Sequence, residues 1–238
     1  FFWLVQSLNA LHNYFNIVQI RVALLALFDL KDRNLITDKV LKNVITFLEG
    51  FHFSYNAVLS RKSNSFEKIY SSFAIEVRKC TSKEQVARII EQKLYAPINK
   101  IYPSYNDFVV GFIELSYSKE YNFSNTKTKY AINKINCLYS GNEIFDDNGS
   151  IEHILPEKDS TNIGNLILLE SNINHDADNQ PYTSKKELYR TSNYKWVKKF
   201  VEENDNFALT NIQERAKSLA KLYYEKVLNR TIEKTSNE

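Results

Sequence analysis

Apolar residues recur at helical spacing through much of the first 140 residues. Thr37 and Asp38 provide a helix start signal, and a single face of a 3.6-residue repeat then carries Val40, Leu41, Val44, Ile45 and Leu48. Ser65, Ser82 and Ser104 precede similar stripes. The 238 residues include only 5 Gly and 4 Pro, which is too few for the many tight turns of an all-β protein. We therefore expect residues 1–140 to form a helical domain and the chain to be mainly α.

Composition limits the class of protein further. Hydrophobic residues make up 43% and charged residues 25%, as in an ordinary water-soluble globular protein. No stretch approaches about 18 uninterrupted apolar residues, so we expect no membrane-spanning helix. Cys80 and Cys137 form neither a disulfide framework nor a metal motif, and we expect two reduced thiols in a cytoplasmic protein. Because the chain contains no Met, we expect it to be part of a longer protein.

The character of the sequence changes at Gly141. Turn-forming Asn and Asp residues fill the stretch from Gly141 to Gly149, which we interpret as a linker into a second module over residues 141–238. Two short apolar runs of strand length follow, at Ile151–Leu155 and Ile163–Leu169. A further helix is expected from Asn211 to Asn229. The only β structure predicted is thus a small hairpin with helices around it.

The predicted hairpin carries the residues that point to chemistry. Glu152 and His153 are adjacent on an extended chain, so their side chains face opposite sides. A hairpin return brings Asn165 near the loop, and Asn174 follows nine residues later at an expected helix start, from which it can reach back towards Glu152. One side of the strand can then bind a metal while the other faces a scissile phosphate.

This pattern resembles the HNH, or ββα-metal, nuclease motif through Glu152, His153, Pro156, Asn165 and Asn174. The resemblance implies that His153 is the general base and that Asn165 orients its loop. It also implies that Glu152 and Asn174 bind the metal. Both offer only oxygen donors, which favours Mg²⁺ (or Mn²⁺) over Zn²⁺.

Two neighbours of Asn174 are expected to have lesser roles in this site. Asp178 is expected either as a further metal ligand or as a group behind the ligands, and His175 as a solvated residue or a group behind the ligands.

A narrower resemblance covers roughly residues 150–230. The segments Glu-His-Ile-Leu-Pro and Ile-Gly-Asn-Leu, then Asn174, Lys185-Lys186 and a final helix with Arg215, resemble the C-terminal half of GmrSD-type modification-dependent restriction endonucleases. This resemblance implies a nuclease that cuts double-stranded DNA in bacterial anti-phage defence. It also implies a ParB-like NTPase half, in the same full-length chain or as a partner subunit, for which no nucleotide-binding motif is found in this sequence.

Basic residues are frequent after the predicted hairpin, with six between Lys185 and Lys199 against the single acidic Glu187. Aromatic residues are interleaved among them, which is typical of a surface that contacts a DNA backbone. The predicted DNA-contacting residues are Lys185, Lys186, Arg190, Lys195, Lys198, Lys199 and Arg215.

Other interpretations of the same residues stay open. Asn174 on its own is more often a helix N-cap than a ligand, and the lysines could form only a solvated helix face. Arg215 could bind a phosphate or simply pair with a carboxylate. At the level of function, the alternatives are a catalytically silent DNA-binding or scaffold domain and an RNase or nuclease toxin.

Overall fold

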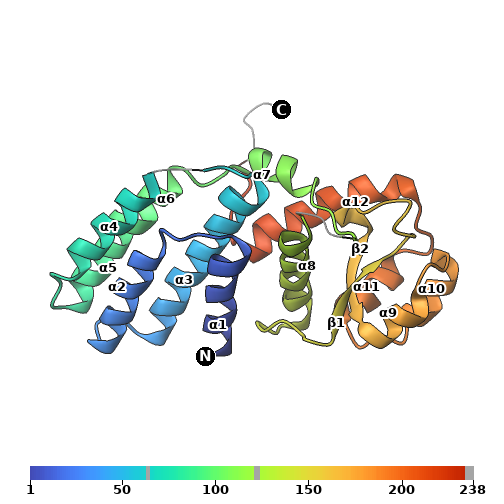
Figure 1. Cartoon of the computed structure of the whole chain (residues 1–238), viewed down its shortest axis with the longest axis horizontal. Helices are drawn as coiled ribbons and strands as arrows, with labels where there is room; N and C mark the ends of the chain where they lie inside the picture. The colour runs from blue at the N-terminus through green and yellow to red at the C-terminus, as the bar shows by residue number, and fades with distance from the viewer. Residues whose placement is uncertain (63–64, 121–123, 234–238) are drawn as a thin grey trace. The chain divides into compact units, whose positions relative to one another are not determined.

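The computed structural model describes residues 1–62, 65–120 and 124–233. Contacts divide the chain into two compact units, Phe1–Pro103 and Ser104–Glu238 (Figure 1). The described residues are mainly helical, as expected. None of the helices among them has both the length and the apolar character that crossing a membrane requires.

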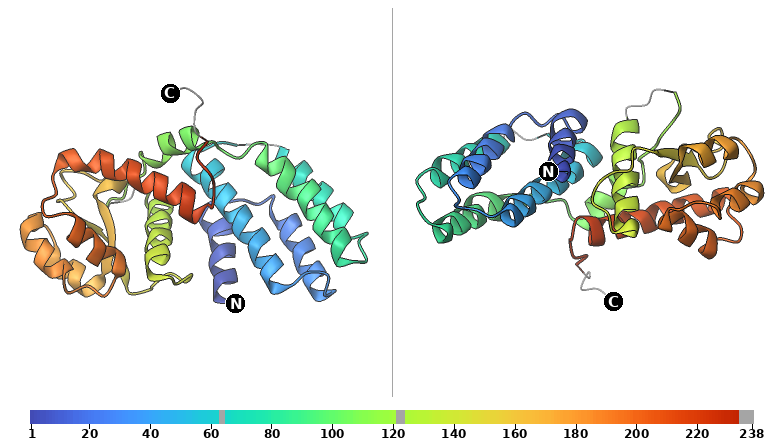
Figure 2. Two further views of the ribbon diagram at one scale, coloured as in Figure 1. Left: turned by 180° about the vertical axis from the view of Figure 1, so that it is seen from behind. Right: turned by 90° about the horizontal axis from the view of Figure 1, so that it is seen from below.

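The first unit is built from helices alone within its described residues. Helix α2 contacts both α3 and α4, and α4 contacts α5, so that these helices lie side by side (Figures 1 and 2). Two of the predicted start signals in this unit act as helix caps: Thr37 Oγ1 accepts a hydrogen bond from the Val40 N–H, and Ser82 Oγ accepts one from the Gln85 N–H. The helices are α1 (Phe2–Asn9), α2 (Arg21–Asp32), α3 (Asp38–His52), α4 (Ser65–Val77), α5 (Lys83–Ile89) and α6 (Ala96–Asn99). Single π-helical turns are η1 (Ala10–Tyr14), η2 (Phe53–Val58) and η3 (Ile90–Tyr95).

The second unit places a two-stranded sheet among helices. Helices α8 and α11 contact strand β2, and α9 contacts both strands. Its helices are α7 (Tyr105–Phe112), α8 (Asn125–Ser140), α9 (Ser171–Ala177), α10 (Tyr182–Tyr189), α11 (Lys195–Glu203) and α12 (Leu209–Leu222). The strands are β1 (Gly149–His153) and β2 (Leu166–Glu170), with a 3₁₀ turn η4 (Ile163–Asn165) before β2 and a π-helical turn η5 (Tyr223–Val227) after α12.

The predicted hairpin-like return is confirmed, with strand ends shifted from the expected ranges. Strands β1 and β2 are antiparallel, with Gly149 opposite Glu170 and His153 opposite Leu166. Strand β2 begins three residues later than expected, because Asn162 caps a 3₁₀ turn by accepting the Gly164 N–H on its side-chain oxygen at 2.8 Å. The four residues Leu166–Leu169 are all buried, since helices cover the sheet.

The boundary between the compact units differs from the one predicted at Gly141. Helix α7 contacts α12, and α8 contacts β2 and α11, so the second unit already begins at Ser104. Gly141 instead ends α8, with a φ of 70° that favours glycine, and its N–H donates to the Cys137 carbonyl. The turn chemistry that suggested a linker is therefore a helix end inside one compact unit.

Candidate functional site

Asn165 fixes the loop that follows β1. Its Oδ1 accepts the Leu155 N–H at 2.8 Å, and its Nδ2 donates to the carbonyl oxygens of Leu155 at 2.9 Å and Ser160 at 2.8 Å. The side chain is fully buried. The backbone of Asn165 also accepts the Ile154 N–H at 2.8 Å. The residue expected to orient the loop of His153 thus binds that loop at both ends.

Gly164 allows a helix to pack directly against this turn. A Cβ at Gly164 would collide with the carbonyl oxygen of Ile212 in α12. Glycine is therefore required by close backbone approach, with no need for an unusual backbone angle. The Ile-Gly-Asn sequence combines this close approach with the anchoring side chain of Asn165.

His153 lies at the end of β1 and is only 4% exposed. Its Nε2 lies 2.9 Å from the carbonyl oxygen of Tyr117, which can only accept a hydrogen bond. Nε2 therefore carries the hydrogen, and the neutral ring keeps a lone pair on Nδ1. Burial lowers the pKa of His153, while the Tyr117 carbonyl and the Glu157 carboxylate oppose that shift. The ring is thereby held in the form that can accept a proton.

Glu152 faces the other side of β1 and contacts α10. Its Oε1 accepts hydrogen bonds from Lys185 Nζ and from the Tyr189 hydroxyl, both at 2.7 Å. Lys185 Nζ also donates to the His153 carbonyl at 2.6 Å. Burial raises the pKa of Glu152, and the charge and hydrogen bond of Lys185 act against that increase. Lys185 is therefore the principal counter-charge of this buried carboxylate.

Asn174 lies within α9 rather than at its start, so it is not an N-cap. Its Nδ2 donates to Ser150 Oγ at 2.8 Å and to the Ile151 carbonyl at 3.0 Å, while its Oδ1 takes part in neither bond. Ser150 and Glu152 are two residues apart on β1, so their side chains share a face of the strand. Asn174 and Glu152 therefore lie on the same side of β1.

The two neighbours of Asn174 in the predicted site are both exposed. Asp178 follows α9 with a positive φ of 34°, and its carboxylate lies 3.8 Å from Lys119 Nζ. For His175, the structure provides no contact that links it to Glu152. Among the described residues, no group of three or more His, Cys, Asp or Glu side chains gathers in a way that could hold a metal ion by itself.

Comparison with known protein families finds a match, and it covers the residues of this site. Residues 112–222, just under half of the chain, match the family model of the GmrSD restriction endonuclease C-terminal domain. The match identifies residues 112–222 as a GmrSD C-terminal domain. No curated protein matches the chain. The GmrSD C-terminal domain thus accounts for η4, both strands and helices α8 to α12, and it assigns the second unit to a family of restriction endonucleases.

The predicted DNA-contacting residues of the GmrSD domain divide into three groups. Lys195 and Lys198 are exposed on α11, and neither forms an ion pair with another described residue. Three others form ion pairs: Lys186 with Asp205, Arg190 with Glu187 and Lys199 with Glu203. Arg190 and Lys199 are exposed, whereas the side chain of Lys186 is only 11% exposed. Lys185 is only 1% exposed and is bound to Glu152. Since an interior ammonium group cannot meet a DNA backbone at the surface, Lys185 does not fit the predicted contact set.

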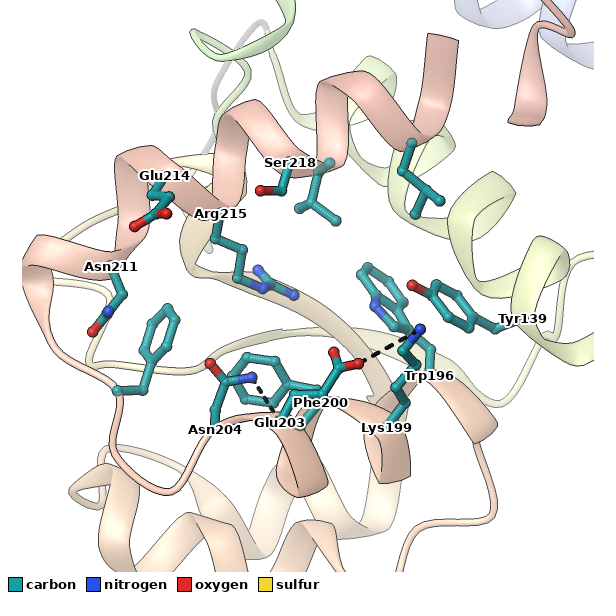
Figure 3. Close-up of a pocket in the computed structure, with 13 residues that line it drawn as sticks. Tyr139, Trp196, Lys199, Phe200, Glu203, Asn204, Asn211, Glu214, Arg215 and Ser218 are labelled. Carbon is teal, nitrogen blue, oxygen red and sulfur yellow. Dashed lines mark hydrogen bonds and ion pairs between the residues drawn. The ribbon is translucent and has the colours of Figure 1, made fainter. Parts of the chain in front are cut away.

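Arg215 of the GmrSD domain also departs from the prediction. Its Nη1 donates to the carbonyl oxygens of Gly164 at 2.7 Å and Leu166 at 2.9 Å. Its guanidinium lies 4.9 Å from the ring centre of Phe200 and 5.7 Å from that of Trp196. Arg215 lines a pocket of about 390 Å³ together with these aromatic residues. Figure 3 shows its side chain extending from α12 into this pocket. Its observed partners are therefore backbone carbonyls and aromatic rings, and it holds α12 to the turn before β2.

Two groups beside His153 could not be predicted from the motif. One is the carbonyl of Tyr117, which belongs to a segment 36 residues earlier. That segment pairs with residues 161–163: the Tyr117 N–H donates to the Thr161 carbonyl at 2.9 Å and the Ile163 N–H to the Leu115 carbonyl at 2.7 Å. The other is Glu157, whose Oε2 lies 4.0 Å from Nδ1 of His153. Only its position, four residues after His153 in the loop, could have suggested it.

Proposed function

We propose that the second unit is an HNH-type, metal-dependent endonuclease that hydrolyses phosphodiester bonds in double-stranded DNA. The observation that carries the proposal is the fixed tautomer of His153. Because Nε2–H is held by the Tyr117 carbonyl, Nδ1 is left as a proton acceptor at the end of β1. The β1–β2–α9 order, with Asn165 holding the loop, supports a ββα-metal module.

In this mechanism, Nδ1 of His153 takes a proton from the water that attacks the phosphorus. Asn165 keeps the loop after β1 in place and so maintains the position of the ring. The low pKa that burial gives to His153 keeps the ring neutral before the reaction. Exposed Lys195 and Lys198 on α11 would contribute contacts to the DNA backbone, which carries no base identity.

Glu152 and Asn174 are the proposed ligands of a divalent cation, Mg²⁺ or Mn²⁺. Both side chains lie on one side of β1 and offer oxygen atoms, which these ions prefer. Because Lys185 and Tyr189 already bind Oε1 of Glu152, a cation would have to bind Oε2 of Glu152 and Oδ1 of Asn174. A bound cation would stabilise the charge that develops on the phosphate and on the departing 3′ oxygen. A ParB-like NTPase part, within the full-length chain or as a partner subunit, is proposed on the family resemblance.

The deciding experiment is incubation of the chain with supercoiled plasmid, with Mg²⁺, with Mn²⁺ and with a chelator, beside the His153→Ala variant. We expect metal-dependent nicking that falls by about 10²–10⁴-fold in the variant, as the loss of a general base does. Binding of DNA without any cleavage would support the catalytically silent alternative. Cleavage of RNA in place of the plasmid would support the RNase alternative.

A further inference from the structure

A second hydrogen-bond acceptor, the carboxylate of Glu157, lies close to Nδ1 of His153. Nδ1, which carries the lone pair, lies 4.0 Å from Oε2 of Glu157. A neutral imidazole nitrogen without hydrogen and an ionised carboxylate cannot hydrogen-bond to each other, because neither has a proton to donate. A single donor molecule that lies between them can satisfy both acceptors.

A water molecule fits that requirement in geometry as well as in chemistry. The two acceptor atoms are 4.0 Å apart, and a typical hydrogen bond from a water oxygen to each of them is about 2.8 Å long. The angle between these two hydrogen bonds at the water oxygen is then about 90°. This angle is near the one between the two O–H bonds of water. The arrangement therefore directs one O–H towards Nδ1 and the other towards Glu157.

Glu157 is itself held in position by the segment that fixes the ring. Its Oε1 accepts the Ser118 hydroxyl at 2.6 Å and the Lys119 N–H at 2.8 Å. Burial acts to raise the pKa of Glu157, but these two hydrogen bonds and nearby positive charge outweigh it, so the pKa lies below the usual value. The carboxylate is thus ionised, and both bonds are made by Oε1 while Oε2 faces the ring.

We propose that Glu157 is a further catalytic residue that holds the attacking water against Nδ1 of His153. This inference rests on the proposed nuclease function. As the water O–H bond breaks, its proton passes to Nδ1, and the water oxygen uses its electron pair to bond to phosphorus. The P–O bond to the 3′ oxygen breaks, and that oxygen keeps the bonding pair and takes a proton from solvent. The Glu157 carboxylate faces the imidazolium that forms and stabilises its charge.

The test compares Glu157→Gln with Ser118→Ala and with Glu202→Gln, an exposed glutamate of α11. Glutamine keeps an acceptor for Ser118 and Lys119 but removes the charge that faces His153. We expect Glu157→Gln to lower single-turnover plasmid nicking by about 10²-fold, in the range seen when one polar group of a catalytic site is removed. DNA affinity and the half-saturating Mg²⁺ concentration should stay unchanged. Ser118→Ala should cost severalfold at most, and Glu202→Gln should match the parent chain.

A double variant separates action on the bound water from a structural role. If Glu157 acts together with His153, His153→Ala combined with Glu157→Gln should be no slower than His153→Ala alone. Nicking near the parent rate in Glu157→Gln, while His153→Ala is inactive, would overturn this inference and leave the proposed function standing. A loss in Glu157→Gln that high Mg²⁺ restores would also overturn it, because it would make Glu157 a metal ligand. Full activity in His153→Ala would instead refute the proposed function.

Discussion

Replacement of Asn165 by Ala tests whether one side chain holds the loop that carries His153. The substitution removes three buried hydrogen bonds, one from the Leu155 N–H and two to the carbonyls of Leu155 and Ser160. A typical intramolecular hydrogen bond contributes about 1 kcal/mol net, and a buried polar group left without a partner costs about 1–3 kcal/mol. We expect the second unit to lose about 3–5 kcal/mol of its free energy of unfolding.

The two tryptophans of the chain allow this loss to be assigned to the second unit. Trp196 is 4% exposed in that unit, so Trp3→Phe leaves a single tryptophan that reports on its unfolding. Urea unfolding followed by Trp196 fluorescence should show a lower midpoint for Asn165→Ala. The exposed Asn172 of α9 provides the matched control, and Asn172→Ala should stay within about 0.5 kcal/mol of the parent.

Asn165→Asp distinguishes the hydrogen bonds from simple packing. An aspartate keeps an oxygen that accepts the Leu155 N–H but places a second acceptor against two carbonyl oxygens. Asn165→Asp should therefore lower the free energy of unfolding of the second unit by at least about 2 kcal/mol, the contribution of those two bonds. Plasmid nicking should fall in Asn165→Ala and in Asn165→Asp. A loss below about 1 kcal/mol in Asn165→Ala would refute the role assigned to this side chain.

Three further predictions follow from buried or exposed charges. Burial lowers the folded-state pKa of His52 to about 4, below the ordinary 6.5. The unfolded chain therefore takes up a proton at a higher pH than the folded chain does. The free energy of unfolding of the first unit should fall by up to about 3 kcal/mol as pH falls from 6.5 to 4. Urea unfolding at several pH values should show this slope through Trp3 fluorescence, and His52→Gln should lack it. Lys185→Met should lower the free energy of unfolding of the second unit by about 3–5 kcal/mol, because it leaves the buried Glu152 unpaired, and adding Glu152→Gln should recover part of that loss. Equal unfolding midpoints in the parent chain, the single variant and the double variant would contradict the pairing. Replacing Lys195 and Lys198 by Ala should weaken DNA binding and flatten its salt dependence by about two phosphate contacts in fluorescence anisotropy, whereas an unchanged salt slope would place the DNA surface elsewhere.

Local patterns predicted several of the helices and the hairpin but not how the elements group. Thr37 and Ser82 are helix caps where the sequence places them, because capping depends on residues within one turn. The division near Gly141 could not be predicted correctly, since it depends on long-range packing of α7 on α12 and of α8 on β2. A glycine that ends a helix and a glycine that opens a linker have the same local signature.

The candidate site shows the same limit more sharply. The sequence spacing correctly places Asn165 at the loop after β1 and Asn174 on the side of Glu152, because both lie on elements adjacent to the hairpin. The burial of Lys185 could not be predicted, because its charge resembles that of its exposed neighbours and only the packing of α10 against β1 brings it to Glu152. The partners of Arg215 could not be predicted either, because they are backbone carbonyls, which every residue has whatever its side chain.

The alternation of side chains along β1 explains how one short strand can keep two opposed electrostatic environments. On one side, Lys185 and Tyr189 donate to Glu152, so this face gathers positive charge and proton donors. On the other side, the Tyr117 carbonyl and Glu157 face the ring of His153, so this face gathers acceptors. Donors around a carboxylate favour its ionised form, and acceptors around an imidazole favour a protonated ring after reaction. Adjacent residues on an extended backbone achieve this separation because the strand itself lies between them, which a helix, with neighbouring side chains about 100° apart, would not provide.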